Sequence, residues 1–246
     1  MKQALLALIL PLCLMAQTGY DIAEMVDERN QPDDMVNDMT MTMTSRTGST
    51  RTLTVHSIRK GDEKQILWFL APADDRGVAF LRIEYEDRDD EMRMWLPSFN
   101  KMRRIASSKK GESFMGSDLS YEDMSSRPLD EYTYELEPDE AIEGQPCWIL
   151  VSLPKPETGS SYSRIVSWVR QSDTVPIKEE YYDRAGNLQK ERTLEMQELK
   201  EYTIPTRMFV RNVQKDHTTE LLFQNIAVDT GVEDDLFHER NLRRLP

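Results

Sequence analysis

Strict alternation of apolar and polar residues is the feature that most constrains the fold of this chain. Residues 33–46 read DDMVNDMTMTMTSR, with methionines at one parity and threonines at the other: Met35, Met39, Met41 and Met43 against Thr40, Thr42 and Thr44. Successive side chains of a β-strand point to opposite faces of a sheet, so this segment is predicted to be a strand with one buried face.

The same period of two recurs along most of the chain. Strand-like segments separated by short turn signals cover residues 49–72, 77–87, 91–97, 130–138, 146–155, 162–171, 176–199 and 206–228. Helical patterns are confined to 21–29 and 233–245. Many strands joined by short turns predict one large, curved antiparallel sheet wrapped around a few short helices.

The first sixteen residues are typical of a secretory signal peptide. Lys2 precedes an apolar run from Ala4 to Met15, and Ala16 is small enough for a cleavage site. The run is shorter than the roughly 20 residues that cross a bilayer, which argues against a membrane anchor. A lipoprotein signal that ends at Cys13 is the less favoured alternative, because a small residue should precede that cysteine and Leu12 is large. We therefore expect 1–16 to be removed and 17–246 to form a single domain without a transmembrane span.

Composition excludes several classes of protein. The formal net charge of -13 argues against nucleic-acid binding, which needs a basic surface. Without the signal, Cys147 is the only cysteine, so no internal disulfide is expected. The three histidines lack the spacing of a zinc site, and no nucleophile motif or phosphate-binding loop occurs. We expect neither a metal nor another cofactor, and no enzymatic activity.

A row of methionines suggests a surface that binds apolar molecules. Methionine is flexible and adapts to varied apolar partners, whereas Val and Ile fit strands better. An ordinary packed core is the alternative. The candidate cavity-lining residues are Ile22, Met25, Met39, Met41, Met43, Leu53, Val55, Leu81, Ile83, Met94 and Trp95.

A basic segment lies at the centre of this acidic chain. Between residues 101 and 110, five cations occur without an acid: Lys101, Arg103, Arg104, Lys109 and Lys110. The wider stretch WLPSFNKMRRIASSKKGESFMGSDLSYEDM resembles the signature of the LolA-like family, often called outer membrane lipoprotein-sorting protein. The resemblance rests on Trp95–Leu96–Pro97, Lys101, Arg103–Arg104–Ile105, Phe114–Met115–Gly116–Ser117–Asp118 and Tyr121–Glu122–Asp123, and it covers nearly the whole chain that follows the signal.

This resemblance implies a periplasmic carrier. Its fold would be an incomplete antiparallel β-barrel, with short helices as a lid over a cavity for lipid or for the acyl chains of lipoproteins. Partners would include an outer-membrane acceptor or an inner-membrane transporter of the resistance-nodulation-division type. The alternative function is an accessory protein of such a transporter, with a packed core and no dedicated cargo.

The signature residues have two possible roles. The candidate rim or signature-loop residues are Lys101, Arg103, Arg104, Phe114, Met115, Gly116, Asp118, Tyr121, Glu122 and Asp123. The arginines could bind lipid phosphates or an acidic partner at an exposed rim, because guanidinium groups bind oxyanions strongly. They could instead be structural and pair with Asp118, Glu122 or Asp123 of the same segment.

Overall fold

A computed structural model describes residues 17–85, 88 and 90–246. The predicted signal peptide and parts of the turn before residue 91 therefore lie outside the described residues. The elements are a helix α1 (Gly19–Asp27) and the strands β1 (Asp34–Thr44), β2 (Thr50–Lys60), β3 (Lys64–Ala71), β4 (Ala79–Ile83), β5 (Glu91–Leu96), β6 (Lys101–Arg104), β7 (Tyr132–Ile142), β8 (Gln145–Pro154), β9 (Tyr162–Arg170), β10 (Pro176–Asp183), β11 (Leu188–Leu199), β12 (Tyr202–Asn212) and β13 (His217–Val228).

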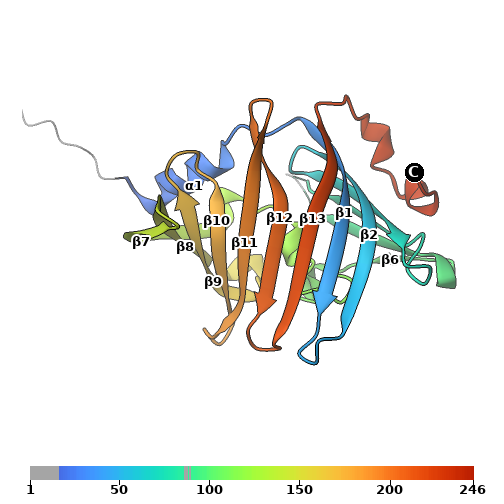
Figure 1. Cartoon of the computed structure of the whole chain (residues 1–246), viewed down its shortest axis with the longest axis horizontal. Helices are drawn as coiled ribbons and strands as arrows, with labels where there is room; N and C mark the ends of the chain where they lie inside the picture. The colour runs from blue at the N-terminus through green and yellow to red at the C-terminus, as the bar shows by residue number, and fades with distance from the viewer. Residues whose placement is uncertain (1–16, 86–87, 89) are drawn as a thin grey trace, which may run out of the picture.

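All thirteen strands belong to one antiparallel sheet, which curves but does not close (Figure 1). The strand order is β6-β5-β4-β3-β2-β1-β13-β12-β11-β10-β9-β8-β7. The first and last strands pair at its centre, with Met41 opposite Leu221. Its two edges, β6 and β7, come from the middle of the sequence. The sequence-based prediction of an incomplete antiparallel barrel is confirmed.

The connection between the two edge strands determines how the sheet is filled. Residues 105–131, called here the crossing segment, leave β6 at one edge and enter β7 at the other. Figure 1 shows this segment in green behind the sheet, on its concave side. It contains only short 3₁₀ turns, at Ser107–Lys109, Glu122–Met124 and Leu129–Glu131. The predicted lid of short helices is therefore largely an irregular segment, with a single α-helix beside it.

Helix α1 covers the other end of the concave face. Its first turn is closed by a capping box in which Thr18 and Asp21 exchange hydrogen bonds. Ile22 and Ala23 are buried against Leu150 and Val169 of β8 and β9. The helix lies two residues earlier than the pattern in 21–29 predicted, which is within the usual uncertainty of helix ends.

The C-terminal segment covers the convex face at the opposite end. It forms two 3₁₀ helices, Asp234–Leu236 and Glu239–Arg243, in place of the longer helix that the sequence predicted. Phe237 and Leu242 pack on Trp68, and the Trp68 indole nitrogen donates to the Asn241 carbonyl at 3.3 Å. This packing gives the outer side of β3–β5 an apolar layer of its own.

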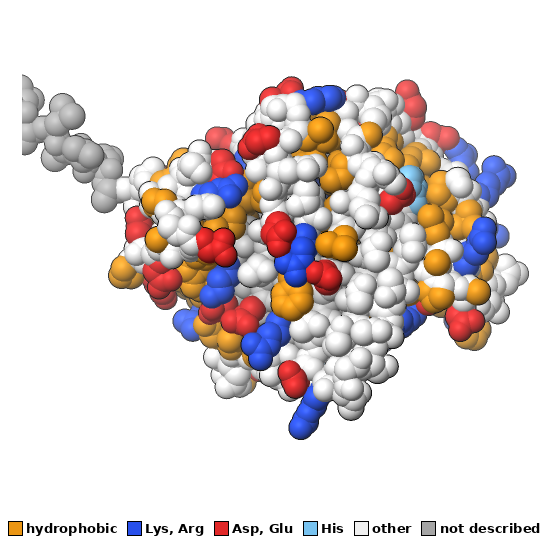
Figure 2. Space-filling view, viewed as in Figure 1, with side chains coloured by type: hydrophobic (Ala, Val, Ile, Leu, Met, Phe, Trp, Pro, Cys, Tyr) orange, Lys and Arg blue, Asp and Glu red, His pale blue; other side chains and the backbone are white. Residues whose placement is uncertain are grey.

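The centre of the convex face is polar, as the threonine parity of β1 predicts. Figure 2 shows few hydrophobic side chains over the centre of this face, where acidic and basic side chains are grouped near the middle of the sheet. In that region Arg207 forms ion pairs with Glu195 at 2.6 Å and Glu220 at 2.5 Å. The methionine parity consequently faces the concave side.

Candidate functional site

An apolar surface, called here the methionine face, covers the concave side of β1–β5 and β13. The register of β1 and β2 sets Met39 opposite Val55 and Met41 opposite Leu53, as their shared parity predicts. The members of this face are Met39, Met41, Met43, Leu53, Val55, Leu67, Phe69, Phe80, Met92, Met94 and Leu221, all of which are buried.

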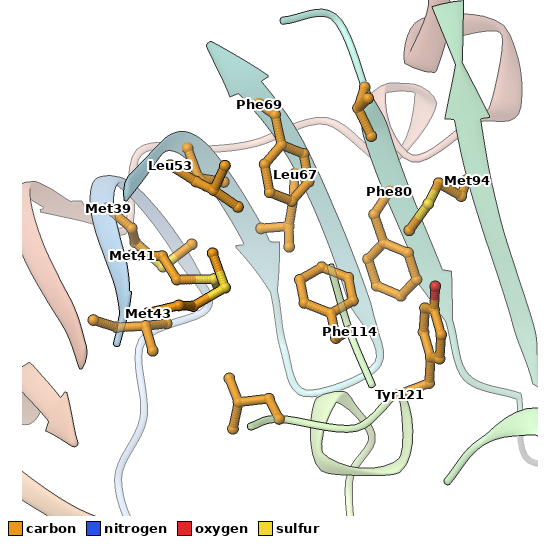
Figure 3. Packing of buried hydrophobic residues seen from close by; sticks show 14 of the residues in the cluster. Met39, Met41, Met43, Leu53, Leu67, Phe69, Phe80, Met94, Phe114 and Tyr121 are labelled. Carbon is orange, nitrogen blue, oxygen red and sulfur yellow. The ribbon is translucent and has the colours of Figure 1, made fainter. Parts of the chain in front are cut away.

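The crossing segment packs its own apolar side chains on the methionine face (Figure 3). Phe114, Leu119 and Tyr121 are 0%, 5% and 4% exposed. The Phe114 ring lies 5.1 Å from the Phe80 ring and 5.7 Å from the Tyr121 ring, each in an edge-on arrangement. The predicted rim residues Phe114 and Tyr121 are therefore part of the core, and they occupy the surface predicted to bind cargo.

Three predicted cavity residues lie on the wrong side of the sheet. Leu81, Ile83 and Trp95 pack on the convex face with Phe237 and the rest of the C-terminal segment. Adjacent side chains of a strand point to opposite faces, and in β5 Met94 faces the methionines while the adjacent Trp95 faces the convex side. The prediction that these three residues line a cavity with the methionines is therefore wrong, because their side chains point to the opposite face of the sheet.

The predicted cavity residues of the helix lie apart from the methionines. Ile22 is fully buried, but it packs in the cluster with Leu150 and Val169. Met25 is 36% exposed and its sulfur accepts a hydrogen bond from Gln17 at 3.9 Å. Neither residue contributes to the methionine face.

Between the methionine face and the apolar cluster under α1, the concave side of β9–β11 holds the crossing segment by buried charges. Asp123 and Lys190 form an ion pair whose side chains are 2% and 3% exposed. The Asp123 carboxylate also accepts from Ser120 N at 2.6 Å and from the Tyr162 hydroxyl at 2.9 Å. Burial raises the pKa of Asp123, but the charge of Lys190 and the hydrogen bonds from Lys190 and Ser120 outweigh this effect. The pKa therefore lies below its usual range.

A second buried carboxylate ties the end of the crossing segment to the sheet. Glu179 is 2% exposed and forms ion pairs with Arg127, at 2.8 Å, and with Arg192. Tyr181 donates its hydroxyl to Glu179 at 2.7 Å. Burial raises the pKa of Glu179, but the two guanidinium groups outweigh that effect and hold the pKa well below its usual range.

Two further carboxylates of the signature are also bound within the fold. Asp118 accepts from His217 and from Thr219, both at 2.7 Å. Glu122 accepts from the hydroxyls of Ser160 and Ser161. All three signature carboxylates thus have partners outside the basic segment.

The structure separates the basic residues from these carboxylates. Arg103 pairs with Glu112 at 3.3 Å, and both side chains are more than 40% exposed (41% and 47%). Lys101 and Arg104 are exposed on the edge strand β6. Arg103 thus pairs with Glu112 of the same segment, and neither arginine forms an ion pair with Asp118, Glu122 or Asp123.

Two signature residues shape the tip of the crossing segment. Met115 and Gly116 both have positive φ, 53° and 82°, which glycine adopts without steric cost. The Met115 carbonyl accepts from Arg51 of β2 at 3.2 Å. This contact holds the tip beside the turn between β1 and β2.

Sequence reasoning missed most partners of the crossing segment. Glu179 and Tyr181 of β10, and Lys190 and Arg192 of β11, lie at alternate positions and face the concave side. That alternation of charged and aromatic residues was the available signal. It did not identify Asp123, which lies 67 residues from Lys190 in the chain.

Among the described residues, two surface clefts lie away from the methionine face. One, of about 400 Å³, is bordered by residues 31–33 and 60–63. The other, of about 730 Å³, lies between residues 144–146, 170–173, 196–198 and Thr203. Within the described ranges, no cluster of His, Cys, Asp and Glu could hold a metal ion, and no helix is long and apolar enough to span a bilayer.

Comparisons with known proteins agree on the fold. A family model described as an uncharacterized protein matches residues 61–244. A DUF1329 family protein from Desulfovibrio piger is 31% identical with a TM-score of 0.87, over 91% of this chain and 97% of that one. A structure from Vibrio parahaemolyticus, described as an outer membrane lipoprotein-sorting protein domain, is 30% identical with a TM-score of 0.84, over 92% and 98% of the two chains.

A more distant structure extends the likeness. A LolA superfamily protein from Nitrosomonas europaea is 20% identical with a TM-score of 0.74, over 92% of this chain and 100% of that one, and it shares the fold. None of the curated proteins compared with the chain matches it. The predicted resemblance to the LolA-like family is confirmed.

Proposed function

Because the chain belongs to the DUF1329 family and has a LolA-like fold, we propose that it is a non-enzymatic carrier. It binds lipid, or the acyl chains of lipoproteins, on the methionine face and transfers them towards the outer membrane. The signal-like residues 1–16 would direct residues 17–246 to the periplasm as one carrier domain. The observation that carries the proposal is a concave apolar face covered by a single crossing segment.

Energies of burial support an exchange between the crossing segment and cargo. Each buried apolar side chain contributes about 1.5–3 kcal/mol, so Phe114, Leu119 and Tyr121 together contribute about 5–9 kcal/mol. An acyl chain of about 15 methylenes contributes about 12 kcal/mol at roughly 0.8 kcal/mol each. A single long acyl chain can therefore replace these three side chains on the methionine face.

The flexible side chains of this face suit such an exchange. Met39, Met41 and Met43 can repack around chains of different shape, whereas branched side chains would fix one shape. The exposed cations Lys101, Arg103 and Arg104 lie on the adjacent edge strand, where they would meet a lipid phosphate or an acidic surface. A transporter of the resistance-nodulation-division type and an outer-membrane acceptor are the proposed protein partners.

A binding experiment with matched variants tests this proposal. An apolar fluorescent probe should bind the wild-type protein and bind Met41→Asp more weakly. Thr42→Asp is the control, because the adjacent Thr42 faces the convex side and should leave probe affinity unchanged. Native mass spectrometry of protein purified from the periplasm should show a lipid adduct, which solvent extraction then releases.

The same experiment distinguishes the proposed carrier from the alternative, an accessory protein without cargo. An accessory protein with only a packed core would carry no lipid adduct. It would also bind the probe no more tightly after Phe114→Ala, a change that removes a covering ring and leaves the strands intact. Unchanged affinity in a folded Met41→Asp protein would show that this face does not receive cargo.

A further inference from the structure

The sheet contains a gap between β10 and β11 that its strand order hides. Pairing of these strands ends at Lys178 opposite Thr193, although β11 continues to Leu199. Within the described residues, the last six residues of β11 pair only with β12. In Figure 1 the β11–β12 hairpin extends at the top of the view beyond the start of β10. One side of this stretch of β11 is thus an interior edge of the sheet.

The larger surface cleft coincides with this gap. Its volume is about 730 Å³, and Met196, Gln197 and Glu198 of β11 form one wall. The opposite wall consists of residues 170–173, in the turn between β9 and β10, and residues 144–146, in the turn before β8. The unpaired strand and the cleft are independent observations of the same place.

The side chains of the walls are largely bound to one another. Arg170 pairs with Asp173 and also donates to the Gln145 side chain at 3.1 Å. Thr203 donates to Glu198 at 3.1 Å. The main-chain groups on the open side of β11 are consequently the groups in the cleft that a ligand can best satisfy.

We propose that this cleft binds an extended segment of a partner polypeptide, which adds a strand alongside residues 194–199. Six residues of strand span about 20 Å, at roughly 3.3 Å each, so the occupant is a short segment. Main-chain hydrogen bonds give such strand addition its affinity, while wall pockets select alternate side chains. Arg170 and Asp173 neutralise each other, and Glu198 accepts a hydrogen bond from Thr203, so the charged side chains of the walls already have partners within the fold, which favours an uncharged segment.

The outer edges of the sheet are less suited to this role. Strand β6 has four residues, three of them cationic. Strand β7 contains Pro138, which has no N–H to donate, among several acids. Short, charged or proline-containing edges resist strand addition, whereas the interior edge of β11 has a formed cleft beside it. This inference is independent of the acyl-chain proposal, because the cleft and the methionine face share no residues.

The probes for this cleft are peptides selected from a random heptapeptide library for binding to the folded full chain. The variant Ser172→Trp fills the cleft from an exposed wall position, and Ser49→Trp, in the exposed turn between β1 and β2, is the matched control. Selected peptides should bind the wild type and Ser49→Trp equally and bind Ser172→Trp at least about tenfold more weakly. Raising the salt from 50 to 500 mM should change the affinity less than about threefold, because no net charge is neutralised.

Two measurements establish the mode of binding. The peptide should slow hydrogen exchange of amides in 194–199 and leave those of β7 unchanged. Successive N–H groups of a strand point to opposite sides. N-methylation of every second peptide residue should therefore abolish binding when the methylated N–H groups face β11, and it should be tolerated when they face away. Failure to enrich any peptide, protection of β7 in place of β11, or equal binding to Ser172→Trp would each overturn the proposal.

Discussion

The buried ion pair between Lys190 and Asp123 makes a quantitative prediction about how the crossing segment is held. We consider Lys190→Met, which keeps the length of the side chain and removes its charge. Arg103→Met is the matched control, because Arg103 also joins a strand to the crossing segment through an ion pair with Glu112. The two pairs differ in burial, with side chains 2–3% exposed in one and 41–47% exposed in the other.

The difference in burial sets the expected magnitudes. Removing one partner of a buried pair leaves an uncompensated charge and costs about 3–5 kcal/mol, whereas an exposed pair contributes about 0–1 kcal/mol. Asp123 would retain its hydrogen bonds from Ser120 and Tyr162, so we expect a value near the lower limit, about 3 kcal/mol. Replacing both partners, in Lys190→Met with Asp123→Leu, should cost less than Lys190→Met alone.

Urea unfolding followed by tryptophan fluorescence measures these free energies. At about 2–4 °C per kcal/mol for a domain of this size, 3–5 kcal/mol corresponds to a fall in Tm of about 6–20 °C. The Tm of Arg103→Met should remain within about 4 °C of the wild type. The reasoning is refuted if Lys190→Met loses less than 1 kcal/mol, or if the double variant is less stable than the single one.

Acidification provides an independent check with a defined sign. In the wild type the lowered pKa of Asp123 contributes stability that is present above its unfolded pKa of about 3.9 and lost as pH falls through the folded pKa. In Lys190→Met, burial without the cation should raise that pKa above 3.9. The loss of stability caused by Lys190→Met is then present at neutral pH, where Asp123 is ionised. It disappears as the pH falls towards 4 and Asp123 becomes protonated. The stability difference between the two proteins should accordingly narrow between pH 7 and pH 4.

Other predictions concern the core, the rim and the C-terminal segment. Phe114→Ala should lower the free energy of unfolding by about 3–5 kcal/mol, measured by urea unfolding, and a loss below 1 kcal/mol would show that the ring is not core. Arg103→Gln with Arg104→Gln should leave Tm nearly unchanged and weaken salt-sensitive binding to anionic vesicles, and a large fall in Tm would contradict the exposed rim. Asp34 accepts main-chain hydrogen bonds from Thr230, Gly231 and Val232, so Asp34→Ala should cost about 1–3 kcal/mol and speed hydrogen exchange there; unchanged exchange would exclude this anchor.

The sequence predicts the face of a strand only where its two sides differ. In β1 one side is methionine and the other threonine, and the structure buries the methionine side. In β4 the residues Ala79, Phe80 and Leu81 are all fully buried, because the crossing segment covers one side and the C-terminal segment covers the other. Alternation carries no information in such a strand, which explains why Leu81 was placed with the methionines.

Long-range partners and short elements escape sequence reasoning for a different reason. Strand β6 has four residues, too few to establish a period, and it exists because β5 supplies a partner for Arg103 and Arg104. The pairing of Asp123 with Lys190 depends on where the crossing segment passes over the sheet. Local spacing contains neither fact, although the resemblance of 95–123 to a family signature marked the segment as important.

The topology of the sheet explains why the signature holds opposite charges that do not neutralise one another. Its cations belong to an edge strand, where side chains extend into solvent. Its carboxylates come later, after the chain has moved inward over the concave face, where an unpaired charge would be costly. Partners must then come from strands beyond the centre of the sheet, and Lys190 of β11 and His217 of β13 fill that role. These partners satisfy the carboxylates, while on β6 Arg103 forms an exposed ion pair with Glu112 and Lys101 and Arg104 are exposed to solvent.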